Sequence, residues 1–596
     1  MTKKLKSGTP FVYDENDRVV GIRDPHTGTD TDLVTATRGP GGGSGLSAGE
    51  PLELRAYTSL VDPRGSLSGT AAVFRPTVVA AVAQSVAAGV PILGGATWYV
   101  SNVAANGFAL GNDSNSGLSK ALPMLTIAAA HDAAAPGDTI IVNSSETIYD
   151  SAFFSINKSL TILPWSFRGV TIRSTNTSYT LYINADNVTL GALVIDTEIT
   201  SGGRADSAVR GPAAGSAKRG LKINGALLKG NTYSMYFTGL CEVQNVEVQS
   251  AGSARAQMLL EPALPGSVTV DGLVSDAPLT CMPSVPGVSL AMCGCTVAFS
   301  ASGTQRALRA VGCAHYLIER NELYVDGSTA AFGIHISPHA TQTTYSAVIR
   351  RNRIRLGAAA AQLTTGYGIG IGAEVATAGE FRSVEICENE INHANHGLFV
   401  GYCVQEADVW GNVLRDTIIG LISKGNLTGD VVHHHNVVVG GPLSGGALRA
   451  KESSKTKHYN NLVIFDARSA AAGVFAYGTD GSVGCEFANN VLYAPGLSVY
   501  RAASLIDTST ATFRRNNYFG SFSATTFNGA AWADWLDVEP TALNADPAFV
   551  GAGDYRLTAA SPLIGAGDGA VAALAPRNFL GLPSSPTNLG PMPVAA

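Results

Sequence analysis

A short motif with a central asparagine recurs eight times between Glu319 and Asn517 of this chain. The shared asparagines are 23 to 37 residues apart, and they are Asn321, Asn352, Asn389, Asn412, Asn436, Asn461, Asn490 and Asn517. Repeats of this length built from strand-like residues are typical of a β-solenoid. Mostly apolar side chains stand three residues before and two residues after each asparagine, as expected for inward positions of a coil. We expect each asparagine to mark a bend between two strands, where it tolerates unusual backbone angles, and its amide to bond to the neighbouring coils.

The composition supports short strands and tight turns. The 596 residues include 67 glycines and 27 prolines, and only 14% are charged, which disfavours amphipathic helices. A net charge of -6 argues against a general nucleic-acid binder. No apolar run reaches the roughly 18 residues that cross a bilayer, and the basic start MTKKLK is not followed by the apolar segment of a signal peptide. We therefore expect neither membrane insertion nor classical export.

The chain divides into four expected segments. Residues 1–50 form a polar arm with a Gly-rich linker, either a flexible tail or an arm that orders against a partner. Residues 51–96 read as a connector or a short oligomerising helix, residues 97–530 as the solenoid, and residues 531–596 as a closing segment. The run LTIAAAHDAAA predicts a short helix that ends before Pro136 and covers the apolar end of the first coil.

Two stretches resemble a known family. A YVS strand, a GNDSNSG loop, an Ala-rich helix and PGDTI follow one another, and LNADPAFVGAGDYRLTAASPLIGAGD stands near the other end. This order resembles the opening and closing segments of right-handed parallel β-helix proteins of the pectate-lyase-like superfamily, over about residues 97–570. The resemblance implies an all-β right-handed parallel β-helix (solenoid) with a short N-terminal capping helix and an extended N-terminal arm. It is specific for the fold and not for a reaction.

The front of the chain resembles a bacteriophage tail spike or tail fibre. The arm VYDENDRVVGIRDPHTGTDTDL precedes a Gly-rich linker and a β-helix that starts near residue 97. The resemblance implies a homotrimer that is assembled in the host cytoplasm, becomes part of the virion and attaches to phage tail or baseplate proteins through residues 1–50. It also implies binding, with or without depolymerisation, of bacterial surface polysaccharide. The alternatives are a non-enzymatic, structural or adhesin-like virion protein and a secreted polysaccharide lyase.

Candidate site residues come from the strand that follows each asparagine. The aligned segments are 333–337, 397–401, 420–424, 447–451 and 473–477, and their third and fifth residues are expected to point outward. This alignment places Lys424 and Lys451 at the same position of adjacent coils, with Arg449 on the same face. Such cations repel one another unless Glu452 pairs locally or an acidic sugar or sulfate binds. The expected substrate-binding residues are His335, Phe399, Glu452, Phe475 and Tyr477.

The chemistry of this face is left open between several readings. The cations are similar to those of β-helix polysaccharide lyases, which implies Lys424 or Lys451 as a base with a pKa lowered by its neighbours, and Arg449 as the carboxylate clamp. Binding of an anion without cleavage, a solvated basic ladder and a subunit contact are the other readings. Hydrolysis needs two carboxylates. The pairs 196/198 and 388/390 are expected to face solvent, so a lyase is favoured over a hydrolase, although a trimer could supply the pair from two chains.

We expect no metal site and no cofactor. In the run HHH at 433–435, alternation turns His434 away from His433, and the column shared by His433 and His458 is mostly apolar. These residues therefore read as core histidines. The GNDSNSG loop lacks the closing glutamate of a calcium loop and reads as a turn. The eight cysteines lie inside the repeats and read as packed free thiols.

Overall fold

The computed structural model describes residues 95–520 with gaps in the loops, parts of 536–594, and four short strands between residues 4 and 32. The chain divides into two units, Met1–Phe74 and Arg75–Ala596. In the first unit, β1 (Lys4–Leu5), β2 (Phe11–Tyr13), β3 (Val19–Arg23) and β4 (Asp30–Asp32) pair in order as an antiparallel sheet. These strands lie within residues 1–50, the segment that the sequence analysis assigned to a flexible tail or to an arm that orders against a partner. The expected connector at 51–96 lies almost wholly outside the described residues.

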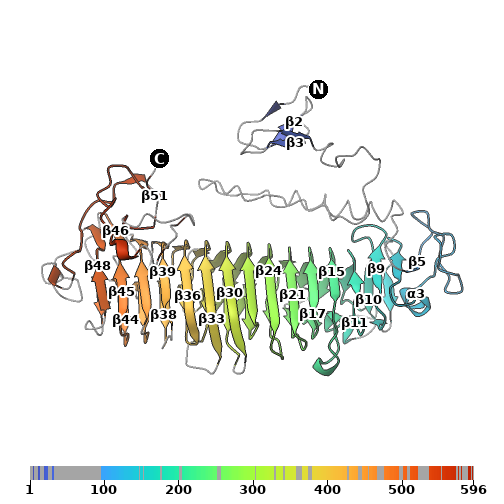
Figure 1. Ribbon diagram of the computed structural model, residues 1–596. Coiled ribbons are helices and arrows are strands. Elements are labelled where there is room, and N and C mark those ends of the chain that lie inside the picture. The colour runs from blue at the N-terminus through green and yellow to red at the C-terminus, as the bar shows by residue number, and fades with distance from the viewer. Residues whose placement is uncertain are drawn as a thin grey trace. The chain divides into compact units, whose positions relative to one another are not determined.

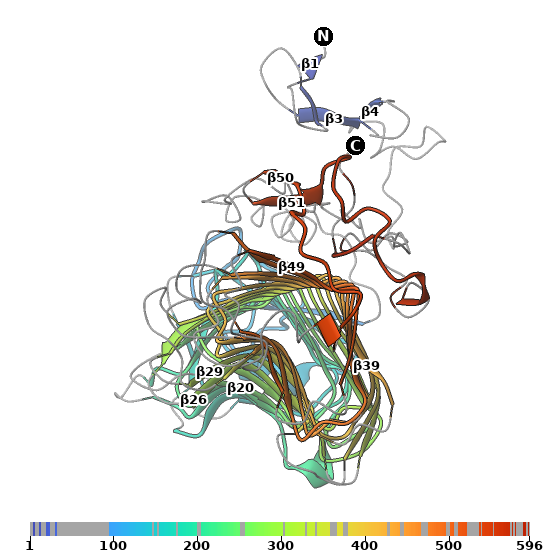
Figure 2. The same ribbon diagram turned by 90° about the vertical axis from the view of Figure 1, so that its left-hand side faces the viewer.

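The second unit is a right-handed parallel β-helix, as the sequence predicts. Each coil contributes one strand to each of three long parallel sheets, which we call sheet I, sheet II and sheet III in the order in which the chain enters them. Strands of sheet I lie side by side from β9 to β48 in Figure 1, and the coils superpose when viewed along the solenoid in Figure 2. Every third strand returns to the same sheet, so equivalent residues of successive coils are about 4.8 Å apart.

The strands of the three sheets have the following bounds. Sheet I contains sixteen strands: β5 (Thr97–Val100), β6 (Thr139–Val142), β9 (Thr161–Pro164), β12 (Thr189–Leu190), β15 (Leu221–Asn224), β18 (Cys241–Gln244), β21 (Gly266–Asp271), β24 (Val288–Cys293), β27 (His315–Glu319), β30 (Thr343–Arg350), β33 (Glu380–Cys387), β36 (Val404–Trp410), β39 (Val431–His434), β42 (Thr456–Tyr459), β45 (Cys485–Ala488) and β48 (Ala511–Arg514). Sheet II contains fifteen: β7 (Tyr149–Ser151), β10 (Thr171–Ser174), β13 (Val194–Asp196), β16 (Leu227–Gly230), β19 (Glu247–Ser250), β22 (Val274–Ser275), β25 (Thr296–Ala301), β28 (Glu322–Gly327), β31 (Arg353–Leu356), β34 (Glu390–Asn392), β37 (Val413–Arg415), β40 (Val437–Val439), β43 (Leu462–Ile464), β46 (Val491–Ala494) and β49 (Asn517–Gly520). Sheet III contains fourteen: β8 (Phe154–Ile156), β11 (Tyr179–Ile183), β14 (Ser207–Arg210), β17 (Tyr233–Phe237), β20 (Gln257–Leu260), β23 (Leu279–Cys281), β26 (Thr304–Val311), β29 (Ala330–Ser337), β32 (Tyr367–Ile371), β35 (His396–Val400), β38 (Ile419–Lys424), β41 (Gly446–Lys451), β44 (Phe475–Asp480) and β47 (Arg501–Leu505).

The expected capping helix is present as α3 (Ile127–Ala133). Thr126 caps its start by accepting a hydrogen bond from the backbone N–H of Ala129, and Ile127 and Ala130 pack into the core of the first coils. The side chain of Lys158 donates to three carbonyl groups at the C-terminal end of the helix, each at 2.8 Å. The helix therefore covers the first coil and is held there by the following one.

The asparagine column forms a continuous ladder of hydrogen bonds. From the second rung on, Oδ1 accepts from the backbone N–H and from Nδ2 of the asparagine one coil earlier, and Nδ2 also donates to a main-chain carbonyl of the preceding coil. In the first rung, Oδ1 of Asn321 accepts from the backbone N–H of Cys295. The ladder runs through Asn321, Asn352, Asn389, Asn412, Asn436, Asn461, Asn490 and Asn516. Every rung is buried. The amides thus satisfy backbone groups in the bend between sheets I and II, where the strand ladder stops.

Two details of the ladder correct the sequence analysis. The last rung is Asn516 and not Asn517, because Phe513 pairs with Phe487 and fixes the register of the final coil. The left-handed backbone conformation belongs to the residue before the asparagine, for example Arg320 (φ 56°) and Arg351 (φ 57°), rather than to the asparagine itself. The asparagine is needed for its two-sided amide and not for its backbone freedom.

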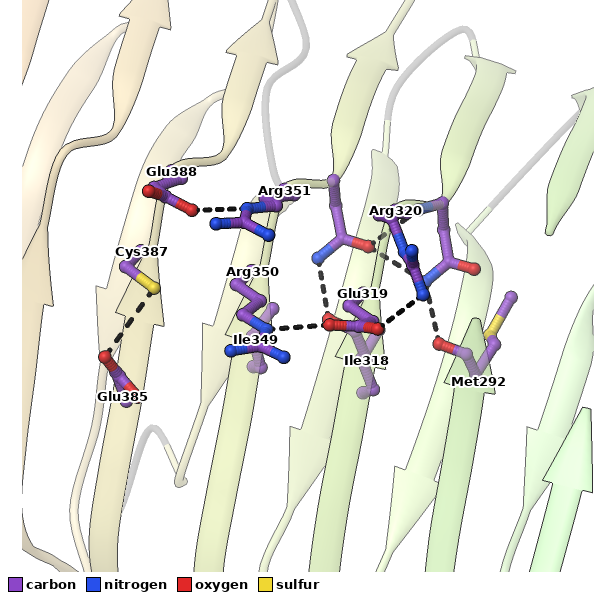
Figure 3. A network of polar contacts seen from close by, with 12 residues as sticks. Met292, Ile318, Glu319, Arg320, Ile349, Arg350, Arg351, Glu385, Cys387 and Glu388 are labelled. Carbon is purple, nitrogen blue, oxygen red and sulfur yellow. Dashed lines mark hydrogen bonds and ion pairs between the residues drawn. The ribbon is translucent and has the colours of Figure 1, made fainter. Parts of the chain in front are cut away.

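The outer side of this bend carries ion pairs (Figure 3). Glu319 lies between Arg320 (2.7 Å) and Arg350 (2.7 Å), and Arg351 pairs with Glu388 at 2.6 Å. Burial opposes the ionisation of Glu319, but the hydrogen bond and charge of Arg350 together with Arg320 outweigh it and lower its pKa. Charged residues in the bend therefore find partners in the neighbouring coil.

The C-terminal segment closes the ladder. Oε1 of the fully buried Glu539 accepts from the backbone N–H (2.7 Å) and from Nδ2 (3.0 Å) of Asn516, as the next asparagine would, and Oε2 accepts from the hydroxyl of Tyr518 (2.6 Å). Beyond it, β50 (Phe549–Gly551) and β51 (Asp554–Leu557) form a hairpin, and η3 (Gly569–Val571) follows. A second three-residue helix, η1 (Ala214–Ser216), lies between β14 and β15.

We expect Glu539→Ala to destabilise the last coil by about 2 kcal/mol, because it leaves the backbone N–H and the amide of Asn516 without an acceptor. Glu539→Gln keeps an acceptor at the same place and should lose less than half as much. Hydrogen exchange of the Asn516 amide measures both effects directly. Equal protection in the Ala and Gln variants would contradict a capping role for the carboxylate oxygen.

The described residues contain no helix that is long and apolar enough to cross a membrane.

Candidate functional site

Three cations meet on the outer face of sheet III. Lys424 at the end of β38 pairs with Lys451 at the end of β41, and Ile422 pairs with Arg449. The neighbourhood of Lys424 and Lys451 that the sequence predicts is therefore confirmed, and Arg449 lies two residues before Lys451 on the same strand face. All three side chains are partly exposed. We call Lys424, Arg449 and Lys451 the cation triad.

Glu452 and Tyr402 border the triad. The hydroxyl of Tyr402 donates to the carboxylate of the exposed Glu452, which raises the pKa of Tyr402. The ring of the same tyrosine lies 5.9 Å from Nζ of Lys424. The carboxylate of Glu452, one of the two anions that the sequence offered to the cations, binds the hydroxyl of Tyr402, whose ring lies beside Lys424.

The expected role of Tyr477 is wrong. Tyr477 pairs with Leu448 rather than with Lys451, and it is fully buried in the core, in contact with Phe487 and Phe513. The pairing of β44 with β41 is thus shifted by three residues from the expected one. For the same reason Phe475 pairs with Gly446 and not with Arg449. The sequence alignment failed here because the segment between β43 and β44 is longer than those between β37 and β38 and between β40 and β41, so the register of β44 could not be carried over from those coils.

Phe399 points outward, as predicted, but it offers no open ring face. It is only 4% exposed and stacks on Tyr367 with 4.5 Å between ring centroids and 11° between the planes. Gly370 makes this stack possible, because a Cβ atom there would lie 2.6 Å from the Tyr367 ring. Five residues form this outer apolar cluster, and they are Phe332, Tyr367, Phe399, Ile419 and Ile422.

His396 connects the outer apolar cluster to the triad. Its ring lies 5.3 Å from that of Tyr367, and its backbone pairs with Ile419. Burial lowers the pKa of His396 to about 4, and the charges of Arg449 and Lys424 lower it further, against the effect of a hydrogen bond to Gly366. Its Nδ1 is buried without a hydrogen-bond partner among the described residues. The imidazole is therefore neutral at neutral pH, mainly because it is buried.

His335 lies at the opposite end of the cluster, next to two arginines that sequence reasoning missed. Nδ1 of His335 accepts from Nε of Arg306 (2.8 Å), and its backbone pairs with Arg309. The segment TQRALRAV carries the signal, because its arginines are three residues apart, like Phe332 and His335 on the next strand. His335 is therefore three strand spacings, roughly 14 Å, from Ile422, which lies two residues before Lys424 on β38.

The carboxylates that a hydrolase would need form ion pairs with arginine and lysine side chains. Asp196 was expected to face solvent, but it is 2% exposed, with Arg173 at 3.2 Å and Lys229 at 3.9 Å. Glu388 pairs with Arg351, and Glu390 pairs with Arg353 at 3.1 Å. None of these carboxylates lies on sheet III beside the triad, because Asp196 and Glu390 belong to sheet II and Glu388 to the bend.

The histidine run belongs to the core and to sheet I. His433 and His458 point inward with their rings stacked 4.7 Å apart, whereas His434 points outward and contacts Asp408 at 2.8 Å. The described residues contain no group of three metal-binding side chains. All eight cysteines are free thiols, and six of them are buried, as the sequence suggested.

Comparisons with known proteins give no family. No protein-family model and no curated protein matches the chain. Among solved structures, that of XylC with xylose is similar over 83% of this chain and 98% of that one, with 11% identity and a TM-score of 0.32. The native GH136 lacto-N-biosidase from Eubacterium ramulus covers 70% of this chain and 67% of its own at 10% identity and a TM-score of 0.27. Pectate lyase Pel9A covers 84% and 96%, at 15% identity and a TM-score of 0.23.

Proposed function

We propose that the chain binds an acidic polysaccharide on the outer face of sheet III, and that the cation triad anchors a carboxylate or sulfate group. The observation that carries the proposal is the pairing of Lys424 with Lys451 on adjacent strands, with Arg449 on the same face. The parallel sheet places the three cations at fixed spacings, and an anion that lies across the strands can bond to all three.

The surroundings of the triad support this role. Tyr402, hydrogen-bonded to Glu452, presents an aromatic ring beside Lys424, and the outer apolar cluster gives the face a rigid floor. Burial is the main cause of the lowered pKa of His396, and the charges of Arg449 and Lys424 add to it, as expected beside a face with a positive potential. Such a potential attracts polyanions over long distances at low ionic strength.

When the bound residue is a uronate, the same side chains serve β-elimination. Arg449 faces the carboxylate, and Lys424 or Lys451 removes the proton from the carbon next to it, while the remaining cations stabilise the negative charge that develops. The proton passes to the uncharged form of the lysine, and the electrons of the broken C–H bond form a carbon–carbon double bond. The glycosidic oxygen leaves with the electrons of its C–O bond and takes up a proton from water. Attachment of residues 1–50 to a phage tail and assembly into a homotrimer stay predictions from the resemblance.

Lys424→Ala/Lys451→Ala should weaken binding to polygalacturonate by about a hundredfold, which corresponds to the loss of two charge-assisted contacts. Isothermal titration at low and high salt measures the binding, and absorbance in the ultraviolet band of unsaturated uronates reports cleavage in the same samples. Wild-type affinity should fall as salt screens the triad.

The control is Lys222→Ala/Lys457→Ala, which removes two lysines from sheet I, where they pair with Glu242 and Asp430. This variant should bind like the wild type. A loss of affinity that is equal in the two double variants would refute the triad as the anchor. Binding of neutral dextran as tightly as polygalacturonate would refute recognition of an acidic chain.

A further inference from the structure

A second group of cations flanks the outer apolar cluster at the end away from the triad. Arg306 and Arg309 are on β26, and His335 on β29 pairs with Arg309. The guanidinium of Arg306 is fixed in two ways, because its Nε donates to His335 and its Cζ lies 4.8 Å from the ring centroid of Phe332. His335 is itself held by a 3.2 Å contact between its Nε2 and the hydroxyl of Ser337. The arginine is thus oriented before any ligand binds.

These two arginines have no acidic partner within the described part of the chain. Arg173, Arg350, Arg351 and Arg353 all form ion pairs with carboxylates, whereas no ion pair of Arg306 or Arg309 is found there. Burial lowers the pKa of Arg306, and Arg309 adds to the effect. Burial, followed by the charges of Arg306 and Arg309, also lowers the pKa of His335 to about 4. A half-buried guanidinium without a counter-charge is unfavourable, and an oxyanion would relieve this cost.

The chemistry of the group fits a carboxylate. Both Nη groups of Arg306 make no hydrogen bond within the described residues, and they form the fork that binds a planar carboxylate with two parallel bonds. The neutral His335 accepts from Arg306 and therefore carries its proton on Nε2, so it orients the arginine without adding a charge.

The spacing of the two cationic ends restricts the ligand. Arg309, His335, Gly370, Phe399, Ile422 and Arg449 are successive members of one outward column. Arg309 and Arg449 are five strands apart, roughly 24 Å. Between them the outer apolar cluster offers no cation, so a polymer with an acidic group on every sugar would hold charges over buried rings without a partner. A chain whose acidic residues are separated by neutral sugars matches the face better.

We infer that Arg306 and Arg309, positioned by His335, form a second carboxylate subsite, and that the ligand is a linear polysaccharide in which neutral sugars separate the uronic acids. This inference rests on the proposed function, because the triad holds one acidic residue and the arginine subsite holds the next. The face then recognises the interval between two charges as well as the charges themselves.

The test compares Arg306→Gln/Arg309→Gln with the wild type. The probes are gellan, whose linear repeat carries a single glucuronate among neutral sugars, polygalacturonate, which is acidic at every sugar, and neutral dextran. We expect the wild type to prefer gellan to polygalacturonate, and the double variant to lose about tenfold in affinity for gellan. The matched control is Arg351→Gln/Arg353→Gln, in which both arginines already pair with glutamates, and it should bind gellan like the wild type.

The outcomes separate this inference from the proposed function. Gellan binding that Lys424→Ala/Lys451→Ala abolishes and Arg306→Gln/Arg309→Gln leaves intact would overturn the subsite and keep the triad. If the wild type prefers polygalacturonate to gellan, the inference that neutral sugars separate the uronic acids of the ligand is wrong. A wild type that binds neither acidic polymer would overturn both. A melting temperature of the arginine variant at or above that of the wild type is also expected, because removing unpaired cations relieves repulsion, and it excludes misfolding as the cause of weaker binding.

Discussion

Asn436→Leu is expected to lower the free energy of unfolding by about 3 kcal/mol. Asn436 is fully buried, its Oδ1 accepts from the backbone N–H (3.1 Å) and Nδ2 (2.9 Å) of Asn412, and its Nδ2 donates to Val409 (2.8 Å) and Asn461 (3.0 Å). Leucine fills the space but leaves the N–H of Asn412 and the carbonyl of Val409 unpaired in the core, at about 1–3 kcal/mol each. Urea unfolding followed by circular dichroism measures the loss.

Two further variants complete this experiment. Asn224 is an exposed asparagine on sheet I, so Asn224→Leu should change stability by about 0.5 kcal/mol or less. Asn436→Asp keeps the acceptor but replaces the donor with a charged oxygen facing Val409 and Asn461, and we expect it to be at least as destabilising as leucine. If Asn436→Leu costs no more than Asn224→Leu, the ladder does not stabilise the solenoid.

Acid is expected to destabilise the protein through its buried histidines. Burial lowers the pKa of His433 to about 3 and places those of His435 and His458 well below the usual value. In the unfolded chain these histidines titrate near pH 6.5, so below that pH the unfolded state binds more protons than the folded state. Their contribution is therefore complete above about pH 6.5 and is lost as the pH falls, by about 1.4 kcal/mol per pH unit for each histidine. The melting temperature measured between pH 7 and pH 4.5 should fall steeply.

His458→Phe tests the source of this dependence. The ring of His458 stacks between His433 and Phe487, at 4.7 Å and 5.1 Å, and the column continues to Phe513, so a phenyl ring fits the same place. The variant should keep its stability at neutral pH. It should lose about a fifth of the slope caused by the five histidines with lowered pKa, which include His335 and His396. His315→Phe, on the exposed side of sheet I, is the matched control and should leave the slope unchanged. An unchanged slope in His458→Phe would assign the acid sensitivity to other groups.

The parts of the fold that depend on the asparagine column could be predicted from the sequence. An amide that bonds to the coils on both sides cannot be replaced by an apolar residue, so the column is visible in the sequence and fixes the register of sheets I and II. The prediction was wrong by one position at Asn516, because the next residue is also an asparagine and either one fits the pattern. Glu539 was missed, although its distance of 23 residues from Asn516 is a coil length, because a glutamate in this place does not look like the motif.

Sheet III was harder to predict because loops of variable length separate it from the asparagine. Lys424 and Lys451 aligned correctly because their strands share a pattern of small, apolar and cationic residues, whereas β44 does not share it and Tyr477 was placed outside. The burial of Phe399 and the bond from Arg306 to His335 depend on which side chains meet across three or more strands. The alternation of inward and outward residues along one strand does not predict such contacts between strands.

Because the coils are stacked, the distance between two side chains in one column of sheet III is a whole number of strand spacings. Loss or duplication of one complete coil between Arg309 and Arg449 would move these arginines by about 4.8 Å relative to each other, and the asparagines would still meet rung to rung. A longer loop would leave that separation as it is. A change in the number of coils can therefore adapt a chain of this architecture to a polymer with a different distance between its charges. The residues that bind the ligand need not change.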